Sequence, residues 1–153
     1  MEDKKLIDYS AVVLDETSIE RLLKRFDSLI PKNWTLISDL DPDIPDRTLH
    51  LTISFGPIPN HLEKYLGLSI GLWVEDYGIE NGVFAVGVSG MESKNVKPHI
   101  TVAIDETTGA KPKDSNNIKE WKKLKRPLKV KGKIKEIQNK QYTKLLNNVK
   151  QYD

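Results

Sequence analysis

Two of the three histidines in this 153-residue chain stand in matching sequence contexts. One context is Leu49-His50-Leu51-Thr52-Ile53, and the other is Pro98-His99-Ile100-Thr101-Val102. In each, a threonine follows the histidine two places on, with aliphatic residues between and after. Imidazole titrates near neutral pH, so it can take a proton when neutral and give one when protonated. An isolated motif of this kind is more simply a half-buried strand histidine, but the matched pair predicts a site for acid–base chemistry.

Phosphodiester cleavage is a reaction that uses both forms of imidazole at once. A neutral imidazole takes the proton of an attacking hydroxyl, and a protonated one gives a proton to the leaving oxygen. Thr52 and Thr101 can donate hydrogen bonds to the non-bridging phosphate oxygens, where negative charge grows. Because the two histidines supply both proton transfers, we expect neither a metal nor a cofactor.

Both motifs lie in segments with the alternating pattern of β-strands. Residues two apart on a strand point to the same face, so His50 shares a face with Thr52, and His99 with Thr101. The opposite faces are apolar and predicted to meet the core; they carry Leu51, Ile53 and Phe55 in the first segment and Ile100, Val102 and Ile104 in the second. Placed in one sheet, the two strands would build a single site.

Periodicity and turn residues predict the other elements. The motif strands are predicted at 49–55 and 99–104. We also expect strands at 9–14, 67–74, 83–89 and 128–137, a helix over 18–29 and a short helical segment at 61–66. Residues 105–117 are predicted to be a polar loop. No segment rich in proline or glycine separates two halves of the chain. Residues 1–153 are therefore expected to form a single α+β domain dominated by antiparallel strands.

Composition and charge exclude several classes of protein. The chain has no cysteine, which rules out disulfides, a cysteine zinc site and a thiol nucleophile. No secretion signal is evident, and no apolar run approaches the roughly 20 residues that span a membrane, so no membrane partner is expected. Residues 1–110 hold 10 Lys and Arg against 18 Asp and Glu, whereas residues 111–153 hold 14 against 4. The basic C-terminal quarter suggests an anionic partner, while the acidic body disfavours stable binding of long nucleic acid.

Three aromatic residues are candidates for stacking on a nucleobase, a contact worth about 1–3 kcal/mol. Tyr9 begins the first strand, from which it can face the site. Trp73 lies in an aliphatic strand, where packing in the core is the alternative. Trp121 lies among lysines, a pattern that suits either a nucleic-acid contact or a surface helix covering the core.

Lysines recur through residues 119–135. Lys129, Lys131, Lys133 and Lys135 alternate, so they are predicted to line an exposed side of the last strand and to protect a sheet edge. The remaining cations of this stretch are candidate phosphate contacts, namely Lys122, Lys123, Lys125 and Arg126.

The paired motifs, 49 residues apart, resemble those of the two-histidine (2H) phosphoesterase superfamily, which carries two His-x-Thr/Ser motifs in β-strands. Wider segments resemble a viral branch, the phage anti-CBASS nucleases, which degrade the cyclic oligonucleotide messengers of a bacterial immune system. These segments are 9–14, 66–73, 97–102, 112–116 and 130–134. The chain is also similar to the cyclic-phosphodiesterase part of fungal tRNA ligases.

The resemblance implies an α+β fold with two pseudo-symmetric lobes, built mainly from antiparallel strands around a central cleft with a few helices. It gives His50 and His99 the acid–base roles, and Thr52 and Thr101 the phosphate-holding roles. It implies metal-independent cleavage of 3′–5′ linkages in cyclic di- and trinucleotides by the adjacent 2′-hydroxyl, leaving a linear product. Such a protein would act as a monomer in the cytoplasm of an infected bacterium, where it would let a phage evade CBASS defence.

Two other functions stay open. One is an RNA end-repair enzyme that opens a 2′,3′-cyclic phosphate. The other is a non-catalytic module that binds RNA or nucleotides through the basic C-terminal quarter. The sequence does not decide which histidine is the base and which is the acid, and His61, which lacks the motif, is predicted to be a surface residue.

Overall fold

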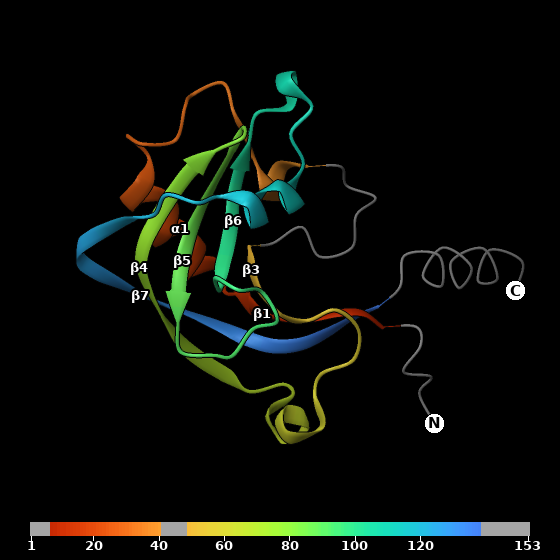
Figure 1. Ribbon diagram of the computed structural model, residues 1–153. Coiled ribbons are helices and arrows are strands. Elements are labelled where there is room, and N and C mark those ends of the chain that lie inside the picture. The colour runs from red at the N-terminus through yellow and green to blue at the C-terminus, as the bar shows by residue number, and fades with distance from the viewer. Residues whose placement is uncertain (1–6, 41–48, 139–153) are drawn as a thin grey trace, which may run out of the picture.

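Antiparallel strands make up most of the regular secondary structure in the computed structural model, which describes residues 7–40 and 49–138 (Figure 1). The strands are β1 (Ile7–Leu14), β2 (Thr35–Leu36), β3 (His50–Ser54), β4 (Ser69–Glu80), β5 (Val83–Ser89), β6 (His99–Ile104) and β7 (Lys122–Gln138). These residues also hold one α-helix, α1 (Glu16–Phe26), and the 3-10 segments η2 (Ile37–Asp39), η3 (Asn60–Tyr65), η4 (Glu106–Thr108) and η5 (Pro112–Asn117). None of the described helices combines the length and the apolar composition needed to cross a membrane.

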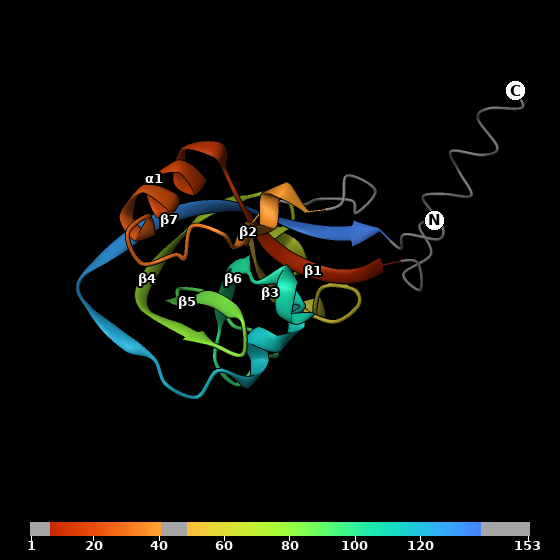
Figure 2. The same ribbon diagram turned by 90° about the horizontal axis from the view of Figure 1, so that it is seen from above.

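Six of the described strands close into a barrel. Their order is β6-β3-β1-β7-β4-β5, and β5 pairs back with β6 to complete the ring (Figures 1 and 2). The short strand β2 is the additional one, and it pairs with the C-terminal end of β6. Closure gives each barrel strand a hydrogen-bonded neighbour on both sides, which removes exposed sheet edges.

The expected α+β fold with two pseudo-symmetric lobes is wrong. The strand with the first motif, β3, pairs with the strand with the second, β6, and both belong to one continuous barrel around a shared core. In the described ranges the only α-helix is the 11-residue α1, so the fold is mostly β. Alternation along a strand identifies its buried face but not its neighbours, and those neighbours decide between two lobes and one barrel.

Several local predictions agree with the structure, and others differ in length. Strands β5 and β6 have the expected bounds, and Asn81 and Gly82 form the turn before β5 with φ values of 57° and 76°. Strands β4 and β7 are longer than expected. Helix α1 begins earlier, because the Asp15 carboxylate accepts a hydrogen bond from the Ser18 amide at 2.7 Å, and it ends at Phe26. The expected loop 105–117 contains η4 and η5, and the tail from 139 lies outside the described residues.

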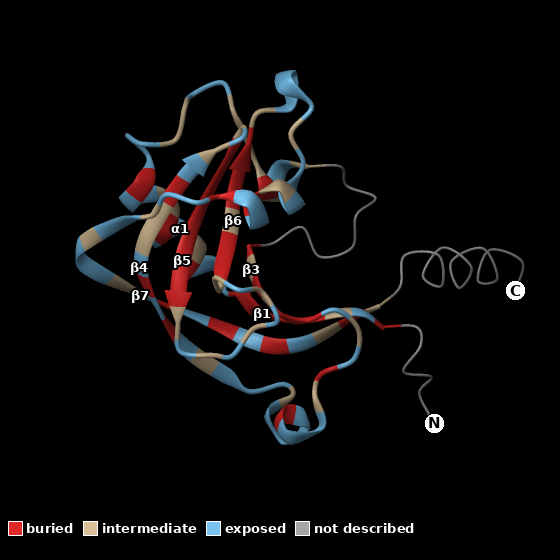
Figure 3. Cartoon of the chain, viewed as in Figure 1, coloured by how far each residue is buried: buried red, intermediate tan, exposed pale blue. Residues whose placement is uncertain are grey.

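The core fills the interior of the barrel and extends to α1. Every barrel strand contributes buried aliphatic residues to this core, and Figure 3 colours the buried residues red. Helix α1 packs against β7 and contributes Leu22 and Phe26 to the same core. The Phe26 ring lies 5.6 Å from that of Phe84 on β5 and 5.7 Å from that of Tyr77 on β4. These aromatic contacts attach the helix to β4 and β5 in addition to β7.

Replacing Phe26 with alanine is expected to lower the free energy of unfolding by about 3–5 kcal/mol, because it leaves a void among buried rings. Urea denaturation measures the change. The matched control is Glu20→Ala on the exposed side of α1, expected to change stability by less than about 0.5 kcal/mol. Equal effects of the two substitutions would contradict the packing described for the helix.

Candidate active site

The four motif side chains lie on the outer face of the barrel. On β3 the buried residues Leu51 and Ile53 point into the core, and on β6 Ile100 and Val102 do the same. Because successive side chains alternate between the faces of a strand, the histidines and threonines of both motifs point outward. The four motif side chains therefore lie on the outside of the barrel wall, and the apolar residues between them pack that wall against the core.

The pairing of β3 with β6 sets how the two motifs meet. The strands are antiparallel, with Leu51 opposite Ile100. Continued by one residue in each direction, this register puts His50 opposite Thr101 and Thr52 opposite His99. Side chains directly opposite one another have Cβ atoms about 4.5–5.5 Å apart. Each histidine therefore has the threonine of the other motif beside it.

All four motif side chains line one cavity of about 160 Å³. The structure thus brings together the residues that the sequence pattern selected. The other lining residues come from the loop before β6, from η2, from the end of β3 and from η5: Asn95, Ile37, Phe55, Pro112, Lys113, Ser115 and Asn116.

The His99 imidazole is held at both ring nitrogens and is only 6% exposed. Nδ1 lies 2.6 Å from the Lys97 carbonyl oxygen, and Nε2 lies 2.9 Å from Ser115 Oγ. A carbonyl oxygen can only accept, so Nδ1 carries the proton of the neutral ring. Burial lowers the pKa of His99 below its ordinary value of 6.5; the hydrogen bond to Lys97 raises it and the Lys97 charge lowers it further. His99 is therefore neutral at pH 7, with Nε2 as an acceptor.

Ser115 is a site residue that the motif pattern does not reveal. Its Oγ lies 2.9 Å from Thr101 Oγ1 and 2.8 Å from the Pro112 carbonyl oxygen, in addition to His99 Nε2. Its one signal in the sequence is the run 112–116, which is among the segments that carry the family resemblance. Segment η5 thus adds a third hydroxyl to those of Thr52 and Thr101.

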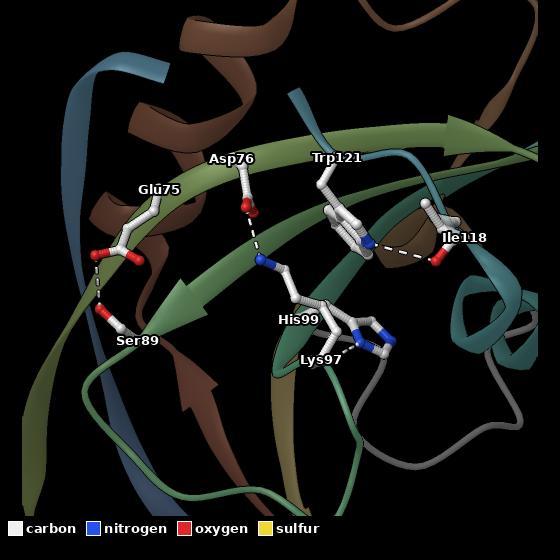
Figure 4. Close-up of polar contacts among 7 residues, drawn as sticks. All are labelled: Glu75, Asp76, Ser89, Lys97, His99, Ile118 and Trp121. Carbon is white, nitrogen blue, oxygen red and sulfur yellow. Dashed lines mark hydrogen bonds and ion pairs between the residues drawn. The ribbon is translucent and has the colours of Figure 1, made fainter. Parts of the chain in front are cut away.

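Lys97 connects the site to β4 and to Trp121. Its Nζ lies 2.6 Å from Asp76 Oδ2 and 5.1 Å from the centre of a Trp121 ring, so the ammonium group lies between the two (Figure 4). The ion pair crosses Gly87, where a Cβ atom would fall 1.8 Å from Asp76 Oδ1. Because Gly87 has no side chain, the Asp76–Lys97 ion pair can pass directly over β5. The ion pair fixes Lys97, whose backbone carbonyl orients His99.

The first motif is supported from another direction. The Tyr9 ring stacks on His50, with centroids 5.0 Å apart and planes inclined by 29°. Tyr9 thus contacts a motif histidine but is not in the cavity lining. Beside β3, Ser93 Oγ donates to the Thr52 carbonyl at 2.6 Å, and the Lys94 amide donates to the Ile53 carbonyl at 2.9 Å. These bonds hold the loop before β6 against β3 and put Asn95 at the rim.

A second cavity, of about 300 Å³, adjoins the first and shares His99, Ser115, Asn95 and Asn116 with it. Trp121 lines this second cavity, where its ring lies 6.1 Å from that of His99.

Two further aromatic residues, Trp73 and Phe55, differ from the sequence-based predictions. Trp73 is 44% exposed on β4 beneath Lys129 and lines neither cavity. Phe55 was expected on the core face, and that prediction is wrong. The strand ends at Ser54, Gly56 takes a φ of 111°, and the Phe55 ring is 70% exposed at the first cavity.

The third histidine stands apart from the site. His61 Nε2 pairs with Glu92 Oε1 at 2.6 Å on the surface, as expected for a residue outside the motifs. Among residues 7–40 and 49–138, no three His, Asp or Glu side chains gather in a way that could hold a metal ion.

Comparison with known proteins adds no assignment. A scan against models of protein families finds no match, and a search of curated proteins finds none either.

In the free protein, neutral His99 is expected to be the Nδ1–H tautomer, because the Lys97 carbonyl oxygen accepts a hydrogen bond from Nδ1. Its pKa is expected to lie below 6.5, because burial disfavours the charged ring. Imidazole ¹⁵N chemical shifts, followed through a pH titration, measure both properties. An Nε2–H tautomer, or titration above 6.5, would contradict the geometry.

Proposed function

We propose that this protein is a phosphodiesterase that cleaves 3′–5′ linkages of cyclic di- and trinucleotides without a metal ion. The observation that carries the proposal is the shared cavity, in which two imidazoles and two threonine hydroxyls meet on neighbouring antiparallel strands. This is the set of groups that phosphodiester cleavage by general acid–base catalysis requires. The substrate class comes from the family resemblance of the motifs and surrounding segments.

His99 suits the role of general base. Its Nδ1–H is fixed by the Lys97 carbonyl, which leaves the Nε2 lone pair as the acceptor, next to Ser115 in the lining of the cavity. Its lowered pKa keeps the ring neutral at physiological pH, the state in which a base accepts a proton. In the proposed reaction, Nε2 takes the proton of the substrate 2′-hydroxyl, and the 2′-oxygen forms a bond to the adjacent phosphorus.

His50 then takes the role of general acid. It is the second imidazole of the shared cavity, and its ring stacks on Tyr9 with centroids 5.0 Å apart, which holds the imidazole in place. As the bond from phosphorus to the 5′-oxygen breaks, His50 gives that oxygen a proton. The product is a linear oligonucleotide with a 2′,3′-cyclic phosphate end, which water can open in a second step.

The threonines and one lysine suit the phosphate itself. Thr52 and Thr101 lie beside the histidines and can donate to the non-bridging oxygens as charge accumulates there, Thr101 by turning its proton from Ser115 to the phosphate. Lys113 lines the same cavity and supplies a positive charge for an anionic substrate. The second cavity, with Trp121 on its wall, lies where a nucleobase attached to that phosphate could stack.

A protein with this activity would act in the cytoplasm of an infected bacterium and remove the messengers of CBASS immunity. An RNA end-repair phosphodiesterase would use the same four groups. One observation favours a binding module: the four alternating lysines of β7, residues 129 to 135, are all exposed. The experiments below include both alternatives.

Replacing either His50 or His99 with alanine is expected to lower kcat by about 10²–10⁴-fold, since each removes one proton transfer. The substrates are cyclic di- and trinucleotides in EDTA, with products identified by mass spectrometry. The matched control is His61→Ala, which removes a surface histidine outside the cavity and should leave kcat unchanged.

Three results would contradict this proposal in different ways. Equal activity of the double variant and the wild type would exclude the histidine pair. Faster turnover of RNA 2′,3′-cyclic phosphate ends would favour end repair. Tight, salt-sensitive binding of long RNA, with no turnover and no effect of either histidine, would favour the binding module.

Trp121→Ala is expected to raise KM by about tenfold or more with a smaller change in kcat, because stacking on a base contributes about 1–3 kcal/mol. Phe55→Ala removes an aromatic ring from the lining of the first cavity and tests whether KM also depends on a base stacked there. Steady-state kinetics on a cyclic dinucleotide separates the two parameters. The control is Trp73→Ala, a tryptophan outside both cavities; an equal rise in KM there would contradict the location of the base.

A further inference from the structure

Ser115 is a buried hydroxyl that joins both residues of the second motif. It is 3% exposed, and its Oγ lies 2.9 Å from His99 Nε2, 2.9 Å from Thr101 Oγ1 and 2.8 Å from the Pro112 carbonyl oxygen. It also belongs to the lining of both cavities, so it stands at the wall between them.

The direction of each proton follows from the Lys97 carbonyl. That oxygen accepts from His99 Nδ1, so the neutral ring has no proton left for Nε2. Ser115 is then the donor in its contact with Nε2, and its single proton is shared between Nε2 at 2.9 Å and the Pro112 carbonyl oxygen at 2.8 Å. The lone pairs of Ser115 Oγ are left to accept from Thr101 Oγ1. The chain of donors thus runs from Thr101 through Ser115 and His99 to Lys97.

We propose that Ser115 is a positioning residue that keeps His99 as a neutral base and holds Thr101 beside it. Its effect on catalysis rests on the function proposed above, whereas its hold on His99 is a property of the free protein. Nε2 has a single lone pair, so a substrate hydroxyl that approaches it takes the place of Ser115. The Pro112 carbonyl at 2.8 Å then accepts the Ser115 proton, and the buried hydroxyl keeps a partner.

A purely structural role makes a different prediction. The Ser115 bond to Pro112 spans three residues within η5 and by itself would only stabilise that segment. Loss of such a bond would lower the unfolding temperature without altering how His99 titrates. The protonation of His99 is therefore the readout that separates the two roles.

The experiment compares Ser115→Ala, Ser115→Thr and a control, Asn117→Ala, an exposed residue of η5 that lines neither cavity. Imidazole ¹⁵N titrations are recorded on the free full-length protein. In Ser115→Ala the pKa of His99 is expected to rise toward 6.5, because the neutral ring loses a hydrogen-bond donor. Ser115→Thr retains a hydroxyl and is expected to restore the wild-type titration, and Asn117→Ala to leave it unchanged.

The pH dependence of cleavage then tests the catalytic consequence. In Ser115→Ala, kcat is expected to fall by about tenfold with little change in KM, and the acidic limb of kcat/KM to move to higher pH. A lower melting temperature with an unchanged His99 titration would overturn the positioning role and leave the proposed function standing. A raised His99 pKa in a protein whose wild type cleaves no nucleotide would support the hold of Ser115 while overturning the proposed function.

Discussion

The antiparallel register between β3 and β6, with Leu51 opposite Ile100, is the constraint on which the candidate site depends. This single pairing sends two aliphatic residues into the core and, one position away on each strand, turns a histidine and a threonine outward. A slip of one residue would exchange the faces, burying imidazoles and exposing aliphatic side chains. Burial of the core therefore fixes the mutual placement of the four polar groups, without any direct bond between the two histidines being required.

Closure of the barrel makes this register rigid at the second motif. Strand β6 pairs with β3, β5 and β2, and His99 lies opposite Gly87 of β5. The missing side chain at Gly87 leaves room for the Asp76–Lys97 ion pair, which holds the backbone just before His99. Lys97 thus acts on the histidine twice: its carbonyl fixes the tautomer, and its charge adds to burial in lowering the pKa. His99 is thus oriented by the same strand packing that closes the barrel.

Local features of this structure could be predicted from sequence, and non-local ones could not. The paired motifs and the period of two identified the polar and apolar residues of β3 and β6, because both signals lie within a few neighbouring residues. The barrel was missed because strand partners are far apart in sequence. Phe55 was assigned to the core since alternation was extended one residue beyond the end of β3. Ser115 lies in a polar 3-10 segment with no periodicity, so only its fold-dependent contact with His99 reveals it.

The basic C-terminal quarter is the strongest charge signal in the sequence, but most of its described cations lie away from the candidate site. The alternating lysines of β7 are exposed as expected: Lys129 and Lys131 lie opposite residues of β4, Lys135 opposite a residue of β1, and Lys133 between the two strands. Of the cations in the basic C-terminal quarter, Lys113 lines the first cavity, and none of the β7 lysines or Arg126 lines either cavity. The two adjoining cavities, of about 160 and 300 Å³, together fall within the range of small-molecule sites. Size and charge of the site thus favour a compact anion bound by a few specific groups, and the β7 lysines add a positive field at a distance that salt would screen.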